Sequence, residues 1–251
     1  MLALRRLTSV KQYTPARFAS SLAAKFDASV EELPLREAVR YLNKDMRWSA
    51  QDFLRYANMH ANALLDFNIK KPDTIVLWLP EGAEKHVTMM SAVKAGLKIV
   101  DVDINITEVE DVRAFLKASD CKVIFFKPEH GDHDYLLQLR KAIPEFFEYD
   151  DSHGQMFRSK YFPKLRYFFQ TGALNEVGCV QYKALFLPNY SDNMLGESAE
   201  GITDKDLIYQ QIKKGSNGGI EVCDALPASK VLDLPTWSFA KKIMNKEYFE
   251  V

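Results

Sequence analysis

The chain has 251 residues, enough for one large domain or two small ones with a hydrophobic core. Apolar residues make up 47% and charged residues 27% of it, proportions that exclude a disordered or collagen-like chain. The net charge of −1 conceals an asymmetry, because the first 26 residues hold five basic residues and no acid. Residues 27–251 therefore carry a net charge of −6, which is a poor match for a nucleic-acid binder.

The first 28 residues have the composition of a mitochondrial targeting leader. Residues 1–26 are rich in Ser and Ala and carry arginines, and residues 17–21 (RFASS) resemble a processing-peptidase site. A cationic segment of this kind is drawn inward by the membrane potential. A disordered basic tail without targeting function is the alternative. We therefore expect a mitochondrial protein, on the matrix side or peripheral to the inner membrane.

Hydropathy and cysteine usage exclude two further classes of protein. No stretch approaches the roughly 18 consecutive apolar residues that a membrane-spanning helix needs, and the longest apolar run, residues 75–79, has strand length. Cys121, Cys179 and Cys223 are far apart and form no CxxC pair. This pattern argues against a disulfide framework and a zinc site, and it fits a reducing compartment.

From residue 35 to residue 126 the chain alternates helical spacings with short apolar runs. Apolar spacing predicts helices over residues 35–42 and 53–65, and Ser49 with Asp52 forms a capping box before the second. Gly96 is suited to end a later helix. The remaining helices are expected at 83–95 and 109–118, and the strands at 74–79, 98–102 and 122–126. This order is typical of βαβ units, so we predict an α/β fold with a parallel sheet.

Beyond residue 128 the pattern is less regular. We expect helices at 135–143, 182–187 and 239–246, a strand at 164–169, a polar loop at 189–201 and an ordered element from 202 to 212. Residues 130–134 place two histidines and two carboxylates together, but their spacing fits no standard zinc pattern. We interpret them as a solvated loop in which Asp132 or Asp134 caps the following helix.

Five motifs between residues 30 and 220 occur in the order found in one enzyme superfamily. The segments RWSAQDF (47–53), IKKPDTIVLWLPEGAE (69–84), AVKAG (92–96), VDVDINITE (100–108) and FPKLRY (162–167) carry the similarity. They resemble the N-terminal part of the AMP-forming adenylating superfamily, the acyl-CoA synthetases and their relatives. The resemblance implies a truncated N-terminal α/β subdomain of an acyl-CoA synthetase over residues 29–222. A C-terminal extension or docking arm would then occupy residues 223–251.

The resemblance also implies where a phosphate-binding loop lies. The family's loop reads TSGTTGxPKG, and a gapless alignment places KKGSNGGIEV, residues 213–222, on it. Glu221 then stands at the lysine position, where an anion repels phosphates, although Lys213 and Lys214 partly compensate. We interpret the loop as vestigial and expect no catalytic residue, no cofactor and no metal. The vestigial loop consists of Gly215, Ser216, Asn217, Gly218 and Gly219.

The resemblance and its departures lead to a functional hypothesis. Members of the superfamily need several hundred residues after the loop, and aromatic residues are dense between Phe146 and Tyr190, as at docking surfaces. We therefore predict a non-catalytic accessory subunit of a mitochondrial inner-membrane complex, either ATP synthase or the respiratory chain. We expect its partners to be other protein subunits and not nucleic acid. The chain itself is expected to lie at the periphery of the membrane, without a transmembrane helix.

Three alternatives stay open at this point. The first is a regulatory module that binds a nucleotide or acyl-CoA without turnover. The others are a mitochondrial ribosomal protein and a split ligase completed by a second polypeptide.

Overall fold

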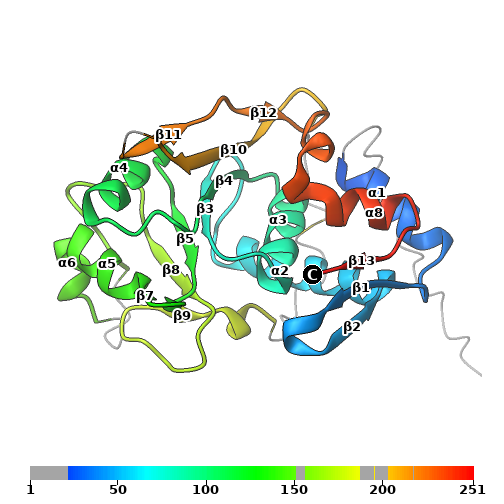
Figure 1. Ribbon diagram of the computed structural model, residues 1–251, viewed down its shortest axis with the longest axis horizontal. Coiled ribbons are helices and arrows are strands. Elements are labelled where there is room, and N and C mark those ends of the chain that lie inside the picture. The colour runs from blue at the N-terminus through cyan, green and yellow to red at the C-terminus, as the bar shows by residue number, and fades with distance from the viewer. Residues whose placement is uncertain (1–21, 151–155, 187–194, 196–202, 217) are drawn as a thin grey trace, which may run out of the picture.

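A mostly parallel sheet forms the centre of the structure. The computed structural model describes residues 22–150, 156–186, 195, 203–216 and 218–251. Within these residues an eight-stranded sheet has the order β11-β10-β4-β3-β5-β8-β9, and β12 pairs with β10 outside this path (Figure 1). The strands from β10 to β9 run parallel, whereas β11 and β12 are antiparallel to β10. The predicted α/β class with a parallel sheet is therefore confirmed.

The sheet uses the apolar runs that the sequence marks as strands. The bounds are Thr74–Trp78 for β3, Lys98–Val102 for β4, Val123–Phe126 for β5, Tyr167–Gln170 for β8, Val180–Gln181 for β9, Leu207–Lys214 for β10, Ile220–Val222 for β11 and Leu226–Pro227 for β12. Strand β8 starts three residues later than expected, because Leu165 donates a backbone hydrogen bond to Phe162 (3.1 Å) in a turn. The predicted strands β3, β4 and β5 are confirmed.

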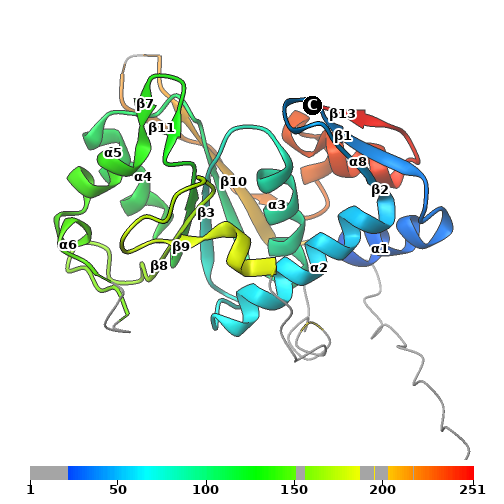
Figure 2. The same ribbon diagram turned by 90° about the horizontal axis from the view of Figure 1, so that it is seen from below.

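Helices cover both faces of this sheet. The bounds are Ala50–Asp66 for α2, Ala83–Ala95 for α3, Val109–Ser119 for α4, Tyr135–Ala142 for α5 and Pro144–Phe147 for α6. Successive residues of β3 point to opposite sides, so Ile75 and Leu77 pack with α2 and α3, whereas Val76 and Trp78 pack with α4 and α5. Figure 2 shows α4 and α5 on one side of the strands and α3 and α2 on the other.

Local signals explain why α2 and α3 begin and end where they do. The Ser49 hydroxyl accepts a hydrogen bond from the Asp52 backbone N–H (3.1 Å), and the Asp52 carboxylate accepts from Ser49 in return. Gly96 ends α3 with a φ of 76°, a conformation that favours glycine. Twelve of the thirteen residues of α3 are buried, because the helix lies between the sheet and neighbouring helices. Both helix predictions are confirmed.

A second, small sheet overturns one prediction. Residues 35–42 do not form a helix, because strand β1 (Glu37–Tyr41) lies there, between β2 (Met46–Ser49) and β13 (Phe249–Glu250). Four apolar residues in so short a segment also suit a strand, and its hydrogen-bond partners decide the outcome. One of those partners, β13, comes from the opposite end of the chain and pairs in parallel, with Val39 opposite Phe249.

Both terminal segments pack against the domain. Helix α1 (Leu22–Glu32) buries Leu22, Phe26 and Val30, so the limit expected between residues 28 and 29 falls inside a helix. Residues 223–251 contain β12, α8 (Ser238–Met244) and β13, and α8 buries Phe239 and Ile243 in the same core. Residues 1–21 and nearly all of 189–201 lie outside the described residues. The limits 1–28, 29–222 and 223–251 stay a prediction.

The later elements follow the expected order. Helix α5 is confirmed, and Asp134 caps it by accepting a hydrogen bond from the Leu137 backbone N–H (2.8 Å). Residues 182–187 give a 3-10 helix, Tyr182–Phe186, and residues 239–246 contribute to α8. Residues 130–134 form a hairpin of β6 (Glu129–His130) and β7 (His133–Asp134). Among the described residues no helix is long and apolar enough to cross a membrane.

Among the buried core side chains whose polar atoms lack hydrogen bonds within the described part of the chain is a histidine. His60 of α2 is fully buried against the rings of Phe125, Tyr182 and Phe186, with ring centroids 5.1–5.6 Å away. Neither ring nitrogen has a hydrogen-bond partner among the described residues. Burial lowers the pKa of His60 to about 3, so the ring is neutral in the folded protein at pH 7. An unpaired buried polar group of this kind destabilises the fold.

We predict that His60→Leu stabilises the protein and reduces its acid sensitivity. The imidazole of His60 binds a proton below pH 6.5 in the unfolded chain, but only near pH 3 in the folded protein. Protonation therefore favours the unfolded state, and the free energy of unfolding decreases as the pH falls from 6.5 towards 3. Urea unfolding at pH 7.5 should give about 1–2 kcal/mol more stability for the variant, and a larger gain at pH 5. Exposed His133 provides the control, His133→Leu. Equal pH dependence of His60→Leu and the parent would contradict the prediction.

Candidate functional site

The carboxyl ends of three parallel strands meet at one edge of the sheet. Strands β3, β4 and β10 lie side by side there, and in open α/β sheets ligands bind outside such an edge. A cavity of about 260 Å³ lies between the residues that follow these strands, with Lys85 of α3 and Thr236 in its wall. The loop between β10 and β11 begins directly beyond the cavity residues Ile212 and Lys213.

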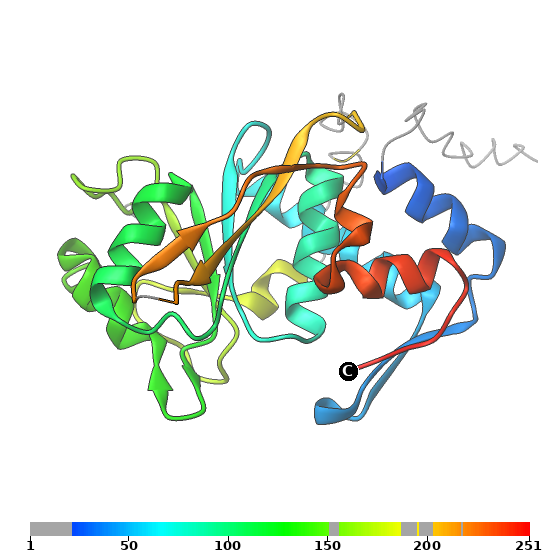
Figure 3. The same ribbon diagram turned by 45° about the horizontal axis from the view of Figure 1, so that its top comes forward.

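The predicted vestigial loop is the turn of the β10–β11 hairpin. Lys213 stands opposite Glu221 and Lys214 opposite Ile220 across the two antiparallel strands. The Gly215 backbone N–H donates to the Gly219 carbonyl (2.9 Å) and closes the turn. Figure 3 shows this hairpin along the edge of the sheet, beside α4. The structure thus brings together the described members of the predicted set, whereas Asn217 lies outside the described residues.

Backbone geometry leaves one side of this turn open. Gly218 and Gly219 have φ values of 80° and 75°, the left-handed region that favours glycine. A Cβ atom built on Gly218 would meet no other atom within 4 Å among the described residues. The backbone of the turn is therefore accessible to a ligand, and N–H groups in such a turn can bind an anion.

The charges around the turn differ from the expectation in one respect. The Lys214 ammonium lies 2.5 Å from the carboxylate of Asp111, which is buried in the first turn of α4. Lys213 is exposed on β10, and its cross-strand neighbour Glu221 is exposed on β11. Of the two lysines expected to compensate for Glu221, one is therefore already neutralised. Sequence reasoning missed Asp111, because it lies about a hundred residues before the loop and only the acidic start of α4 marks it.

A buried ion pair lines the neighbouring cavity. Lys85 Nζ lies 2.9 Å from Asp101 Oδ1, and their side chains are only 7% and 6% exposed. Lys85 also contacts Glu81 (2.8 Å), and the Tyr209 hydroxyl donates to Asp101 Oδ2 (2.7 Å). The pair joins α3 to β4, and the tyrosine extends the connection to β10. No motif in the sequence predicts it.

Burial and the neighbouring charges shift the pKa values of the three ionisable residues in this network. Burial lowers the pKa of Lys85, but the carboxylates of Asp101 and Glu81 outweigh burial and raise it above its usual value. Burial also raises the pKa of Asp101, against the attraction of Lys85. For Glu81, burial is outweighed by hydrogen bonds and charges from His86 and Lys85, so its pKa falls to about 2. The cavity wall therefore carries Glu81 as a carboxylate at neutral pH.

Breaking this ion pair should be costly, and removing both charges should recover much of the loss. We expect Lys85→Met to lower the free energy of unfolding by about 3–5 kcal/mol, because it leaves the Asp101 carboxylate buried and unpaired. In the double variant Lys85→Met/Asp101→Asn no buried charge is left unpaired, because the remaining carboxylate, Glu81, is half-exposed and keeps its hydrogen bond with His86. The new amide oxygen at position 101 would still accept the hydrogen bond from Tyr209. Urea unfolding of both variants measures the difference. A double variant less stable than Lys85→Met would show that the pair does not carry this energy.

Comparisons with known proteins find a family match, curated relatives and solved structures of the same fold. A family model described as AMP-binding enzyme matches residues 26–160. The putative acyl-CoA synthetase YngI of Bacillus subtilis is 21% identical over 201 residues, 79% of this chain and 36% of that protein. The mitochondrial medium-chain acyl-CoA ligase ACSF2 of Rattus norvegicus is 23% identical over 47% of this chain and 19% of its own length. The chain thus spans about a third or less of these curated relatives.

Solved structures show the same fold. The luciferase-like enzyme of the nonluminescent mealworm Zophobas morio superposes with a TM-score of 0.68 at 12% identity, over 96% of this chain and 56% of that one. Coronafacic acid ligase from Pectobacterium brasiliense gives a TM-score of 0.65 at 12% identity, over 92% of this chain and 45% of that one. The resemblance drawn from the sequence motifs is confirmed by these matches.

Proposed function

Because the chain belongs to the AMP-binding enzyme family, we propose that it forms the N-terminal part of an AMP-forming acyl-CoA ligase. The family match over residues 26–160 is the observation that carries this proposal. The curated relatives extend well beyond the matched region, so the activity is that of the whole ligase to which this chain contributes.

This proposal replaces two expectations drawn from the sequence. The predictions of a non-catalytic subunit of ATP synthase or the respiratory chain and of a pseudoenzyme are wrong, because the family match and the relatives indicate an adenylating ligase. Nothing found favours the regulatory module that binds without turnover. The glutamate at position 221 in place of the family's lysine is a local change, and the fold still matches that of solved adenylating ligases.

The aromatic residues behind the subunit hypothesis also have another explanation. Between residues 146 and 190 most of the described phenylalanines are core residues rather than a docking surface. Phe146 stacks on Phe168, with ring centroids 3.8 Å apart, and Phe157 contacts both rings. Phe169 is fully buried on the other face of the sheet. The high density of aromatic residues in this part of the sequence is therefore explained mainly by their burial in the core.

The proposed reaction has two balanced steps. A carboxylate oxygen of the acid attacks the α-phosphorus of ATP, the bond to pyrophosphate breaks, and an acyl-adenylate forms. The thiol sulfur of coenzyme A then attacks the acyl carbon, and AMP leaves with the bonding electrons while the thiol proton goes to solvent. This chain would contribute contacts to phosphate oxygens through the open backbone at Gly218 and the exposed ammonium of Lys213.

Exchange of labelled pyrophosphate into ATP tests the first step. Protein purified from its native source should catalyse exchange that depends on an added carboxylic acid, with medium-chain fatty acids as the first probes. The rat medium-chain acyl-CoA ligase provides the positive control. If the native protein gives no exchange with any acid while the rat ligase is active, the proposal fails.

A matched pair of glycine substitutions assigns the exchange to the loop. Gly218 and Gly131 both have positive φ and no atom within 4 Å of a built Cβ, so an alanine costs the fold a similar amount at each. We expect Gly218→Ala to lower the exchange rate at least about tenfold, equivalent to about 1.4 kcal/mol, because its methyl group fills the open side of the turn. Gly131→Ala, on the β6–β7 hairpin, should leave exchange unchanged. Equal effects of the two would exclude the loop.

We also propose a mitochondrial location. The basic composition of residues 1–21 supports it, as do the relatives named as mitochondrial ligases. Because Leu22 is buried in the core, a targeting segment that is removed must end before it. A fusion of residues 1–21 to a reporter should enter isolated mitochondria, and the same fusion with Arg5→Glu and Arg6→Glu should not.

A further inference from the structure

Basic side chains line the edge of the sheet opposite the candidate site, where the parallel strands begin. Lys98 opens β4 beside Thr74 of β3, and the Lys122 backbone N–H bonds to the Thr74 carbonyl on the other side (2.9 Å). Arg166 follows before β8, with its N–H bonded to the Lys122 carbonyl (2.8 Å). Neighbouring strands lie about 4.8 Å apart, so Lys122 and Arg166 are adjacent at this edge, and Thr74 of β3 separates Lys98 from Lys122.

Most of the cations at this edge are not neutralised. Among the described residues, ion pairs join Lys122 to Asp73 (2.7 Å) and Lys71 to Asp206 (3.4 Å), and Lys164 contacts Asp120. The Glu145 carboxylate accepts a hydrogen bond from the Lys160 backbone N–H (3.1 Å). The basic side chains of this edge that form no ion pair within the described ranges are those of Lys70, Lys98, Lys117, Lys160, Lys205 and Arg166. Residues 27–251 as a whole are acidic, so this edge differs in charge from the rest of the domain.

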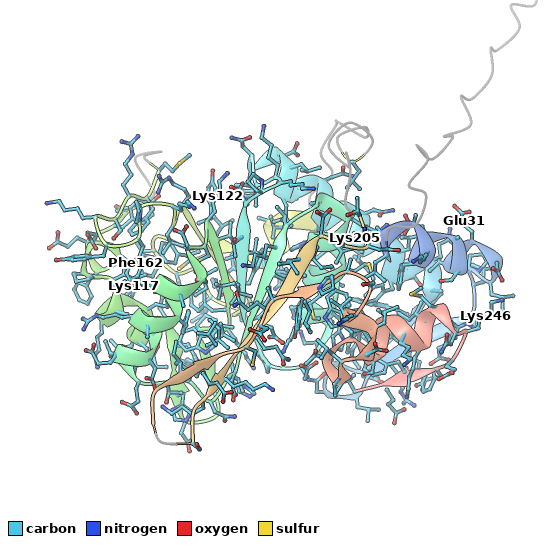
Figure 4. All side chains as sticks on the ribbon, turned by 90° about the horizontal axis from the view of Figure 1, so that it is seen from above. Glu31, Lys117, Lys122, Phe162, Lys205 and Lys246 are labelled. Carbon is cyan, nitrogen blue, oxygen red and sulfur yellow. The ribbon has the colours of Figure 1, made fainter. Side chains whose placement is uncertain are left out.

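An exposed aromatic turn projects from the same edge. The hydroxyl of buried Ser159 accepts hydrogen bonds from the backbone N–H groups of Tyr161 (3.1 Å) and Phe162 (3.2 Å), which fixes the turn. Tyr161 is 72% exposed and has Lys160 on one side. Phe162 covers a small cavity of about 130 Å³ together with Lys117 of α4, and Figure 4 shows these two side chains next to each other.

This combination suits the surface of an anionic membrane. A lysine near such a surface contributes through attraction to acidic headgroups, and tyrosine prefers the interface because its ring is apolar and its hydroxyl polar. We propose that the amino-terminal edge of the sheet binds an anionic phospholipid surface, with the turn at Tyr161 at the level of the headgroups. The candidate site at the opposite edge then faces away from the membrane.

Vesicle sedimentation with a matched pair of variants tests this proposal. The full chain should sediment with vesicles of phosphatidylcholine and phosphatidylglycerol but not with phosphatidylcholine alone. Lys117→Ser/Lys160→Ser should weaken binding about thirtyfold, because each lysine near an anionic surface contributes about fivefold. The control Lys141→Ser/Lys241→Ser makes the same change of charge at two exposed lysines of α5 and α8. Its binding should stay close to that of the parent.

A fluorescence measurement tests the position of the turn. In Tyr161→Trp the new indole should shift its emission to shorter wavelength when anionic vesicles are added, relative to the parent protein. Equal losses in both lysine pairs, or no emission shift at position 161, would overturn the proposal. Binding to a single-stranded RNA that Lys117→Ser/Lys160→Ser abolishes, without vesicle binding, would also overturn it and assign the edge to nucleic acid.

Discussion

The buried pair of Lys85 and Asp101 holds together the edge at which the candidate site lies. Two charges leave water at a cost of several kcal/mol each, and only close geometry with further hydrogen bonds offsets it. Glu81 adds a second ion pair and Tyr209 a hydrogen bond, so the contact links α3, β4 and β10. This contact therefore helps to position the segments that follow β3, β4 and β10, including the glycine-rich turn.

The distribution of charge along the strands explains how the two edges of the sheet differ. Glu81 and Asp103 follow β3 and β4 at the carboxyl edge, whereas at the amino edge the basic residues outnumber their carboxylate partners Asp73, Asp120 and Asp206. The surrounding side-chain charges therefore contribute little attraction to an anion bound at the β10–β11 turn, because the ammonium of Lys214 is already paired with the carboxylate of Asp111. Backbone N–H groups must supply most of the attraction, which makes the conformation of the glycines more important than the missing lysine.

Local signals made the central elements predictable, and contacts between distant residues did not. The cap at Ser49, the stop at Gly96 and the apolar runs of β3 and β4 are encoded within a few residues, so sequence reasoning placed them correctly. Strand β1 was mistaken for a helix because β13 lies some two hundred residues away. In the candidate site the glycines were found from their motif. Asp111 and the Lys85–Asp101 pair were missed, because their partners come together only in the folded chain.

The same distinction explains why the functional hypothesis went wrong while the family resemblance held. The resemblance rested on the order of motifs along the chain, which a single substitution does not disturb. The prediction of a docking subunit took aromatic density as a sign of exposure, which a linear sequence does not show, and Phe146, Phe157 and Phe168 are in fact packed against one another. Among the described aromatic residues of this region, Phe147 and Tyr161 are strongly exposed, and the Ser159 hydroxyl stabilises the turn that carries Tyr161. The exposure of Tyr161 and the basic residues around it, rather than the density of aromatic residues in the sequence, therefore identify the surface that we propose binds phospholipid.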